Sequence, residues 1–167
     1  MIYISIDVGI KNLAYIIYNS ETNEIIQWTI LQLCQSNCNE INMIHLGKNL
    51  YELFNSHISN YHFDKVIIEN QIGKNAIRMK TLQGMITMYF IQNKHENIYH
   101  WNACHKLKHY DIPKKTTYTE RKKLSIEITR NLLKENYQDY LDYFNEHKKK
   151  DDLADCFLQL LDVLKKE

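Results

Sequence analysis

The chain contains few of the residues that interrupt regular structure: it has one proline and four glycines in 167 residues. This scarcity excludes proline-rich or glycine-rich linkers, and the sequence has no internal repeat or low-complexity segment. A chain of this length is expected to fold as one domain with room for a sheet covered by helices on both sides. We therefore predict a single domain over residues 1–167.

Long apolar runs are also missing, since no stretch approaches the roughly 18 to 20 residues that a membrane-spanning helix needs. The first residues predict a short strand that ends in Asp7, whereas a signal peptide has a basic region followed by a long apolar stretch. We therefore expect a soluble, intracellular protein without a membrane partner. Cysteine is scarce as well, and the four cysteines form no CxxC pair and no plausible disulfide framework. We expect reduced thiols at Cys34, Cys38, Cys104 and Cys156.

The chain has almost no net charge, with a formal value of +1 and a pI near 7.7. Global charge therefore does not indicate a nucleic-acid-binding protein, and a basic surface can arise only from local clustering. Such a cluster exists between residues 106 and 123, where seven cations stand against Asp111 and Glu120. Its members are Lys106, Lys108, Lys114, Lys115, Arg121, Lys122 and Lys123.

The first strand contains the most informative single residue. Over residues 2–7 isoleucine occupies every second position, as in a β-strand, until Asp7 ends the run with a carboxylate. A charged group there is costly to desolvate unless a cation or several donors meet it. Gly9 then turns the chain into a second apolar strand over residues 13–18. The alternative is a purely structural role, in which Asp7 only begins a β-turn.

The remaining chain predicts an α/β order with three further strands and four helices. The helix expected after Thr119, capped by that residue, presents Leu124, Ile128 and Leu132 on one face. The loop before it is expected over residues 102–118. Further strands are expected over residues 24–31, 63–69 and 98–101, and further helices over residues 39–57, 76–92 and 148–164.

Four carboxylates stand at the ends of these elements. Asp7 and Glu69 end two strands, and Asp152 and Asp155 share one face of the last helix. They converge if that helix packs against the first and fourth strands, and clustered carboxylates repel each other unless cations neutralise them. Hard oxygen ligands select Mg²⁺ or Mn²⁺. Two such ions would clamp a scissile phosphate and activate water. For Asp151, a neighbour of this set, stabilisation of the helix dipole is the simpler explanation.

These motifs resemble the Holliday junction resolvases of the RuvC family, most closely their poxvirus branch. The resemblance rests on Asp7 with Gly9 and Asn12, on residues 67–71, and on the helical segment 152–156. It implies a ribonuclease H-like fold with a mixed five-stranded sheet, three antiparallel strands followed by parallel ones, flanked by helices. It also implies a homodimer that resolves four-way DNA junctions with two Mg²⁺ ions per active site, for which Mn²⁺ can substitute. If the source is a poxvirus, the host cytoplasm at sites of viral DNA replication is implied.

The resemblance also implies site residues. Asp7, Glu69, Asp152 and Asp155 match the family's catalytic metal ligands, and the branch adds a catalytic lysine that we place at Lys122, with Lys123 and Lys115 as alternatives. The other basic residues near the site are expected to hold DNA phosphates, which position a duplex without reading its sequence. These are Lys74, Arg78, Lys80, Lys106, Lys108, Lys114, Lys115, Arg121 and Lys123.

Several alternatives stay open at this point. Another ribonuclease H-like nuclease could act on RNA–DNA hybrids, flaps or other branched DNA, because a fold does not determine a substrate. An actin-like ATPase also begins with a strand, an aspartate and a glycine turn, but it needs a second phosphate loop and a second domain. A junction-binding protein without catalysis would not need the complete acidic set. The histidines at 95, 100, 105 and 109, and Cys34 with Cys38 and His45, do not have the spacing of a closed zinc site.

Overall fold

A computed structural model describes residues 1–74, 76–113 and 115–166, and of His105 it describes the backbone only. Its centre is a five-stranded sheet in the order β3-β2-β1-β4-β5. The first three strands are antiparallel, and β4 and β5 run parallel to β1. This confirms the expected mixed sheet. The strands are β1 Ile2–Asp7, β2 Asn12–Asn19, β3 Glu24–Gln32, β4 Lys65–Glu69 and β5 Ile98–Trp101.

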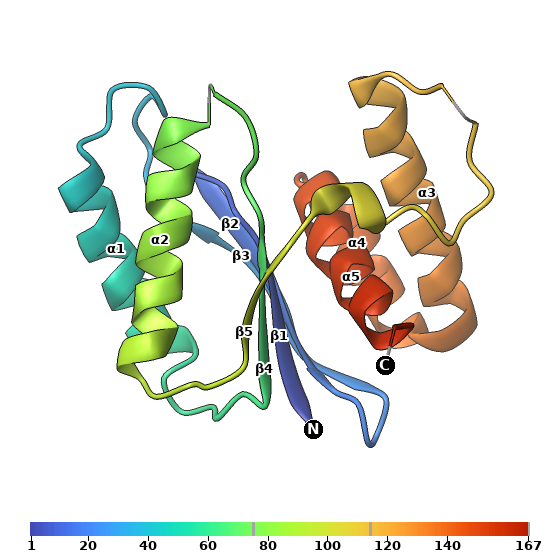
Figure 1. Cartoon of the computed structure of the whole chain (residues 1–167). Coiled ribbons are helices and arrows are strands. Elements are labelled where there is room, and N and C mark those ends of the chain that lie inside the picture. The colour runs from blue at the N-terminus through green and yellow to red at the C-terminus, as the bar shows by residue number, and fades with distance from the viewer. Residues whose placement is uncertain (75, 114, 167) are drawn as a thin grey trace.

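Helices cover both faces of the sheet, as Figure 1 shows. On one face lie α1 and α2, and on the other lies α5 with α3 and α4 beside it. The α-helices are α1 Met43–His57, α2 Ile77–Gln92, α3 Tyr118–Asn136, α4 Leu141–Glu146 and α5 Lys150–Leu164, with 3₁₀ turns η1 Ala103–His105 and η2 Gln138–Tyr140. Among the described residues, none of the helices is both long and apolar enough to cross a membrane.

The alternation of the strands divides the buried side chains into two cores. Ile4 and Ile6 of β1 pack into the core under α1 and α2, whereas Tyr3 lies in the core under α5. In β4 the neighbours Val66 and Ile68 face α1 and α2, and Ile67 faces α5. Successive side chains of a strand point to opposite faces. The odd-numbered positions of both β1 and β4 therefore look toward α5.

The region around α3 differs from expectation in three respects. The helix begins at Tyr118 and its N-cap is Thr117, two residues before the predicted cap, and the Thr117 side chain and Glu120 form a reciprocal capping box. The predicted cap at Thr119 is therefore wrong. The fully buried positions of α3 are Ser125, Thr129 and Leu133, each one residue after the predicted Leu124, Ile128 and Leu132, which are half-buried. Small side chains at two of these positions allow α3 to approach α5 closely. The short helix α4 was not predicted.

Candidate active site

Two strands deliver carboxylates to the same edge of the sheet. Asp7 is the last residue of β1 and Glu69 the last residue of β4. The strands are parallel neighbours with Ile6 opposite Ile68, so the next residue on each strand lies at the same edge. Both acids occupy odd-numbered positions, which face α5. Strand pairing and side-chain alternation together thus place Asp7 beside Glu69 under that helix.

The helix α5 completes the acidic site because polar side chains hold it against β1. The Ser5 hydroxyl donates to the Cys156 carbonyl oxygen at 2.8 Å. From the next turn, the Gln159 amide donates to Ser5 Oγ at 3.0 Å and to the Ile6 carbonyl at 3.1 Å. These hydrogen bonds set the height of α5 along β1. Asp155, one turn before Gln159, is thereby directed toward the end of β1 where Asp7 lies.

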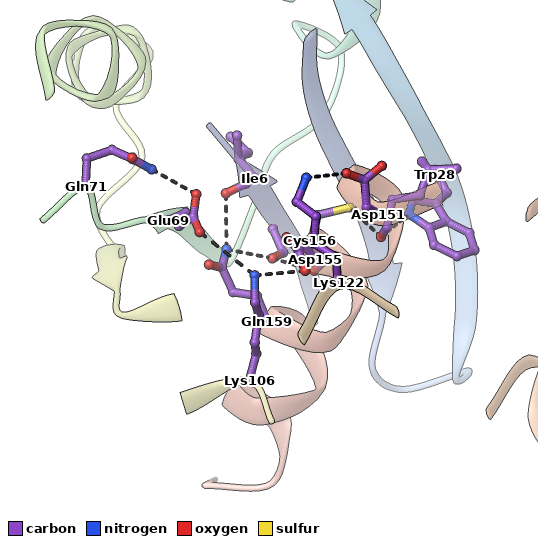
Figure 2. Close-up of polar contacts among 12 residues, drawn as sticks. Ile6, Trp28, Glu69, Gln71, Lys106, Lys122, Asp151, Asp155, Cys156 and Gln159 are labelled. Atoms are coloured by element: carbon purple, nitrogen blue, oxygen red, sulfur yellow. Dashed lines mark hydrogen bonds and ion pairs between the residues drawn. The ribbon is translucent and has the colours of Figure 1, made fainter. Parts of the chain in front are cut away.

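A lysine side chain lies among these acids. Lys106 follows the 3₁₀ turn η1, and its ammonium nitrogen is 2.9 Å from Asp155 Oδ1 and 4.0 Å from Glu69 Oε1. Figure 2 shows it reaching both carboxylates between β4 and α5. All three side chains are largely enclosed, with 13% of the Lys106 side chain, 15% of Glu69 and 19% of Asp155 exposed. The predicted role of Lys106 as an outward phosphate contact therefore does not fit its position in this structure.

The pKa values of the site residues are shifted by burial and by the charges of their neighbours. Burial raises the pKa of Asp7 well above its usual value, and repulsion from Glu69 and Asp155 raises it further, while Lys106 opposes this rise. Burial also raises the pKa of Asp155, against the lowering effect of Lys106. Burial and Asp151 raise the pKa of Asp152 to about 6. Burial would lower the pKa of Lys106, but the surrounding carboxylates raise it.

The acids open into a cleft of about 840 Å³ that holds all four predicted carboxylates. Along with them it is lined by Lys106, Lys108, Arg121 and Lys122, and by Gly9 and Asn12 of the first turn. The carboxylates thus meet the basic segment across one concave surface. Such an acidic floor with basic walls can hold divalent cations together with a phosphodiester.

Nearly the whole chain matches one protein family. The family model described as "Poxvirus A22 protein" matches residues 1–166. The chain belongs to this family. No curated protein matches the sequence.

Solved structures with the same fold include two of viral origin. The fowlpox virus Holliday junction resolvase has 23% identity and a TM-score of 0.68 over 99% of both chains. A complex of Fowlpox virus resolvase with substrate Holliday junction DNA has 25% identity and a TM-score of 0.65, over 99% of this chain and 98% of that one. Thermus thermophilus RuvC in complex with Holliday junction substrate has 10% identity and a TM-score of 0.67, over 99% and 96%. The fold of this A22 family member is therefore the ribonuclease H-like fold of these resolvases.

Of the three candidate catalytic lysines, Lys122 is the one found in the described lining of the cleft that holds the acids. Its ammonium on α3 is paired with Asp151 in the first turn of α5. Burial would lower the pKa of Lys122, but the contact with Asp151 outweighs this effect and raises it. Lys122 lines the cleft, whereas Lys115 and Lys123 are exposed and are absent from its described lining. The assignment of a catalytic role to Lys122 stays a prediction. Asp151, in turn, has a specific partner in addition to any effect on the helix dipole.

The other predicted phosphate contacts fall into separate groups. Lys108 and Arg121 are exposed and line the cleft, while Lys74 and Lys80 are exposed near the loop after β4. Arg78 has a different role, because its guanidinium donates to the Cys38 and Ile41 carbonyl oxygens and so ties α2 to the segment before α1. These contacts do not fit its predicted use as a DNA contact. Lys114 lies outside the described residues.

Sequence reasoning missed the amides that orient the acids. The Gln71 side chain donates to Glu69 Oε2 at 2.8 Å, and its backbone N–H donates to the buried Gln83 Oε1 at 2.8 Å. The carboxylate of Glu69 is thereby held from the side opposite Lys106. A signal existed for Gln159, because it follows Asp155 by four residues and so lies on the same face of the last helix as that acid. Nothing comparable distinguished Gln71 or Gln83.

The histidines and cysteines considered above as zinc ligands contact other groups in the structure. His109 contacts Asp162 at 2.9 Å, His100 contacts Thr87 at 2.8 Å, and His95 is buried against Phe63. The four cysteines are free thiols. In the described part of the chain, no three His, Cys, Asp or Glu side chains are arranged as they stand to hold a metal ion. At the acidic site, the Lys106 ammonium lies between the carboxylates of Glu69 and Asp155.

Proposed function

We propose that this A22 family member is a structure-selective DNA endonuclease that resolves four-way junctions by metal-dependent, paired phosphodiester hydrolysis. The observation that carries this proposal is the meeting of Asp7, Glu69, Asp152 and Asp155 in one cleft that also holds basic residues. The family membership and the likeness to a resolvase bound to Holliday junction DNA support the choice of substrate.

The acidic site fits Mg²⁺, with Mn²⁺ as a substitute, because its donors are all carboxylate oxygens. Asp7, Glu69, Asp152 and Asp155 would hold two ions, whose chemistry is to activate water and to stabilise charge on the scissile phosphate. Burial, and after it repulsion from Glu69 and Asp155, raises the pKa of Asp7, and burial raises the pKa of Asp155, so the ionised carboxylates are costly in this enclosed site. A bound cation would offset this cost by neutralising the carboxylates, which supports the fit.

The residues of the chain itself orient the substrate. Lys108 and Arg121 on the wall of the cleft would hold backbone phosphates, and the exposed Lys74, Lys80, Lys115 and Lys123 would extend this contact. Lys122 would place a positive charge near the phosphate as negative charge builds in the transition state. Its pairing with Asp151 fixes the ammonium in the cleft before substrate arrives. Because these groups contact phosphates, we expect selectivity for branched structure more than for sequence.

Cleavage of two symmetric strands requires two sites related by a two-fold axis, so we propose a homodimer. The face of α2 directed away from the core suits an isologous contact. It bears Ile77, Met88 and Ile91, exposed by 71%, 55% and 52%, on the same helical side as Gly84. A Cβ added at Gly84 would meet no atom within 4 Å, so a partner helix can approach there.

The dimer is tested by sedimentation of Met88→Lys at micromolar concentration. We expect the wild type to sediment as a dimer and this variant as a monomer. The matched control is Ile44→Lys, since Ile44 is 69% exposed on α1, outside the proposed interface. A monomeric wild type would contradict the homodimer.

The activity is tested by cleavage of a synthetic four-way junction, with and without Mg²⁺. We expect paired cuts by the wild type with Mg²⁺, and a loss of at least about 100-fold in Asp7→Asn and Asp155→Asn. Asp139→Asn, at an exposed position outside the cleft, is the matched control and should retain activity. If the protein cuts an RNA–DNA hybrid, a flap or another branched DNA of equal length in preference to the four-way junction, the proposed substrate is wrong. Unchanged activity in Asp7→Asn would exclude the proposed site.

A further inference from the structure

Lys106 differs from the other basic residues around the cleft in the direction of its side chain. Lys108 and Arg121 are exposed, whereas Lys106 turns inward and only 13% of its side chain is exposed. Its ammonium nitrogen lies 2.9 Å from Asp155 and 4.0 Å from Glu69. A lysine is seldom enclosed without a charged partner. Here the partners are carboxylates that we propose as metal ligands.

The backbone of Lys106 is held by its surroundings. The next residue, Leu107, is buried in the core under α5, and the Leu107 carbonyl accepts a hydrogen bond from the Tyr110 N–H. The backbone before it forms the 3₁₀ turn η1. Lys106 is therefore directed at the acids by a packed segment, while its four-carbon stem lets the ammonium move.

The electrostatic need for this cation comes from the acids around it. Asp7, Glu69 and Asp155 are enclosed together, and three like charges at one place repel strongly when water is largely excluded. A positive charge in contact with two of them reduces this repulsion. The same reasoning applies to a divalent cation, so an ammonium and a metal ion would compete for one location.

We propose that the Lys106 ammonium is a built-in counter-ion that stabilises the metal-free site and competes with divalent cations for it. The inference rests on the proposed function only in taking these carboxylates as the metal ligands. In this arrangement Lys106 is a positioning residue. It keeps the acids assembled before cations bind. It also weakens cation binding, because a cation must displace the ammonium from the carboxylates that attract it.

The test uses Lys106→Met, which keeps the length of the side chain and removes its charge. Thermal unfolding is measured in EDTA, and Mg²⁺ binding is measured by titration calorimetry without DNA. In EDTA we expect the melting temperature to fall by about 5 to 10 °C, because the carboxylates lose an enclosed partner. We expect Mg²⁺ to bind about tenfold more tightly, since the competing charge is gone.

Two further variants make the test specific. Lys134→Met removes an exposed charge on α3 outside the described lining of the cleft and should change neither quantity. Lys106→Arg restores the charge and should restore metal-free stability. If Lys106→Met folds only with Mg²⁺, the inference is supported, and if it unfolds under both conditions the lysine has a packing role and the inference fails.

The inference is also overturned if Lys106→Met is as stable as the wild type in EDTA, if its Mg²⁺ affinity is unchanged or weaker, or if none of the proteins binds Mg²⁺. These readouts need no DNA. A wild type that binds Mg²⁺ as described but cuts no junction would overturn the proposed function and leave the role of Lys106 intact.

Discussion

Gln159 offers a sharp test of how the fold assembles the site. Its amide donates to Ser5 Oγ and to the Ile6 carbonyl, and only 2% of the residue is exposed. Gln159→Leu removes both hydrogen bonds and leaves two buried acceptors each short of one donor. A net value of about 1 kcal/mol per hydrogen bond, with some added desolvation cost, gives a destabilisation of about 2 to 3 kcal/mol. For a chain of this size, that lowers the melting temperature by about 4 to 12 °C.

The assay is thermal unfolding followed by circular dichroism, with junction cleavage measured on the same samples at a temperature where the variant is folded. We expect cleavage to fall at least about tenfold, because α5 carries Asp155 one turn from the lost contacts and small displacements of catalytic groups are costly. Gln92→Leu, at an exposed position near the end of α2, is the matched control and should leave both quantities unchanged.

A double-mutant cycle with Ser5→Ala isolates the contact. Because the two side chains share a hydrogen bond, the double variant should be more stable than the sum of the single effects by about 1 kcal/mol. If Gln159→Leu unfolds at the wild-type temperature, or if the two substitutions are additive, the contacts do not hold α5 on β1 as described.

Three further predictions concern the first turn, a buried acid and pH. Gly9→Ala should lower the melting temperature and abolish cleavage, because an added Cβ would lie 2.0 Å from the Asn12 backbone oxygen; unaltered cleavage would contradict this. Asp162→Asn should destabilise the fold by about 2 kcal/mol in thermal unfolding, since its enclosed carboxylate accepts the Trp101 indole N–H at 2.6 Å. Asp152 has a pKa of about 6 against an ordinary value of 3.8, so its ionisation weakens the metal-free fold as pH rises from about 4 to above 6. In EDTA, the melting temperature of Asp152→Asn relative to wild type should therefore rise over that interval, and a constant difference would refute this.

Much of the fold follows from local pattern. The alternation in residues 2–7 predicts β1 with its correct bounds, and residues 98–101 predict β5. Helix positions follow from the apolar spacing, although the first turns of α1 and α5 were placed too early. The error at the start of α3 was avoidable, because Thr117 with Glu120 three residues later is a capping-box signal. The buried face of α3 was not predictable from hydrophobicity, since small residues are buried where two helices approach closely.

The sequence by itself determined the strand and helix order and the four carboxylates at element ends, because side-chain period and residue type are local properties. Only the tertiary structure decided which cations accompany those acids. Lys106, Lys108 and Lys122 look alike in a basic segment, but one is enclosed with Asp155, one is exposed and one pairs with Asp151. The direction of a long side chain depends on the packing of the backbone beneath it and on the charges brought near it by distant segments. No local pattern in the sequence records either of these.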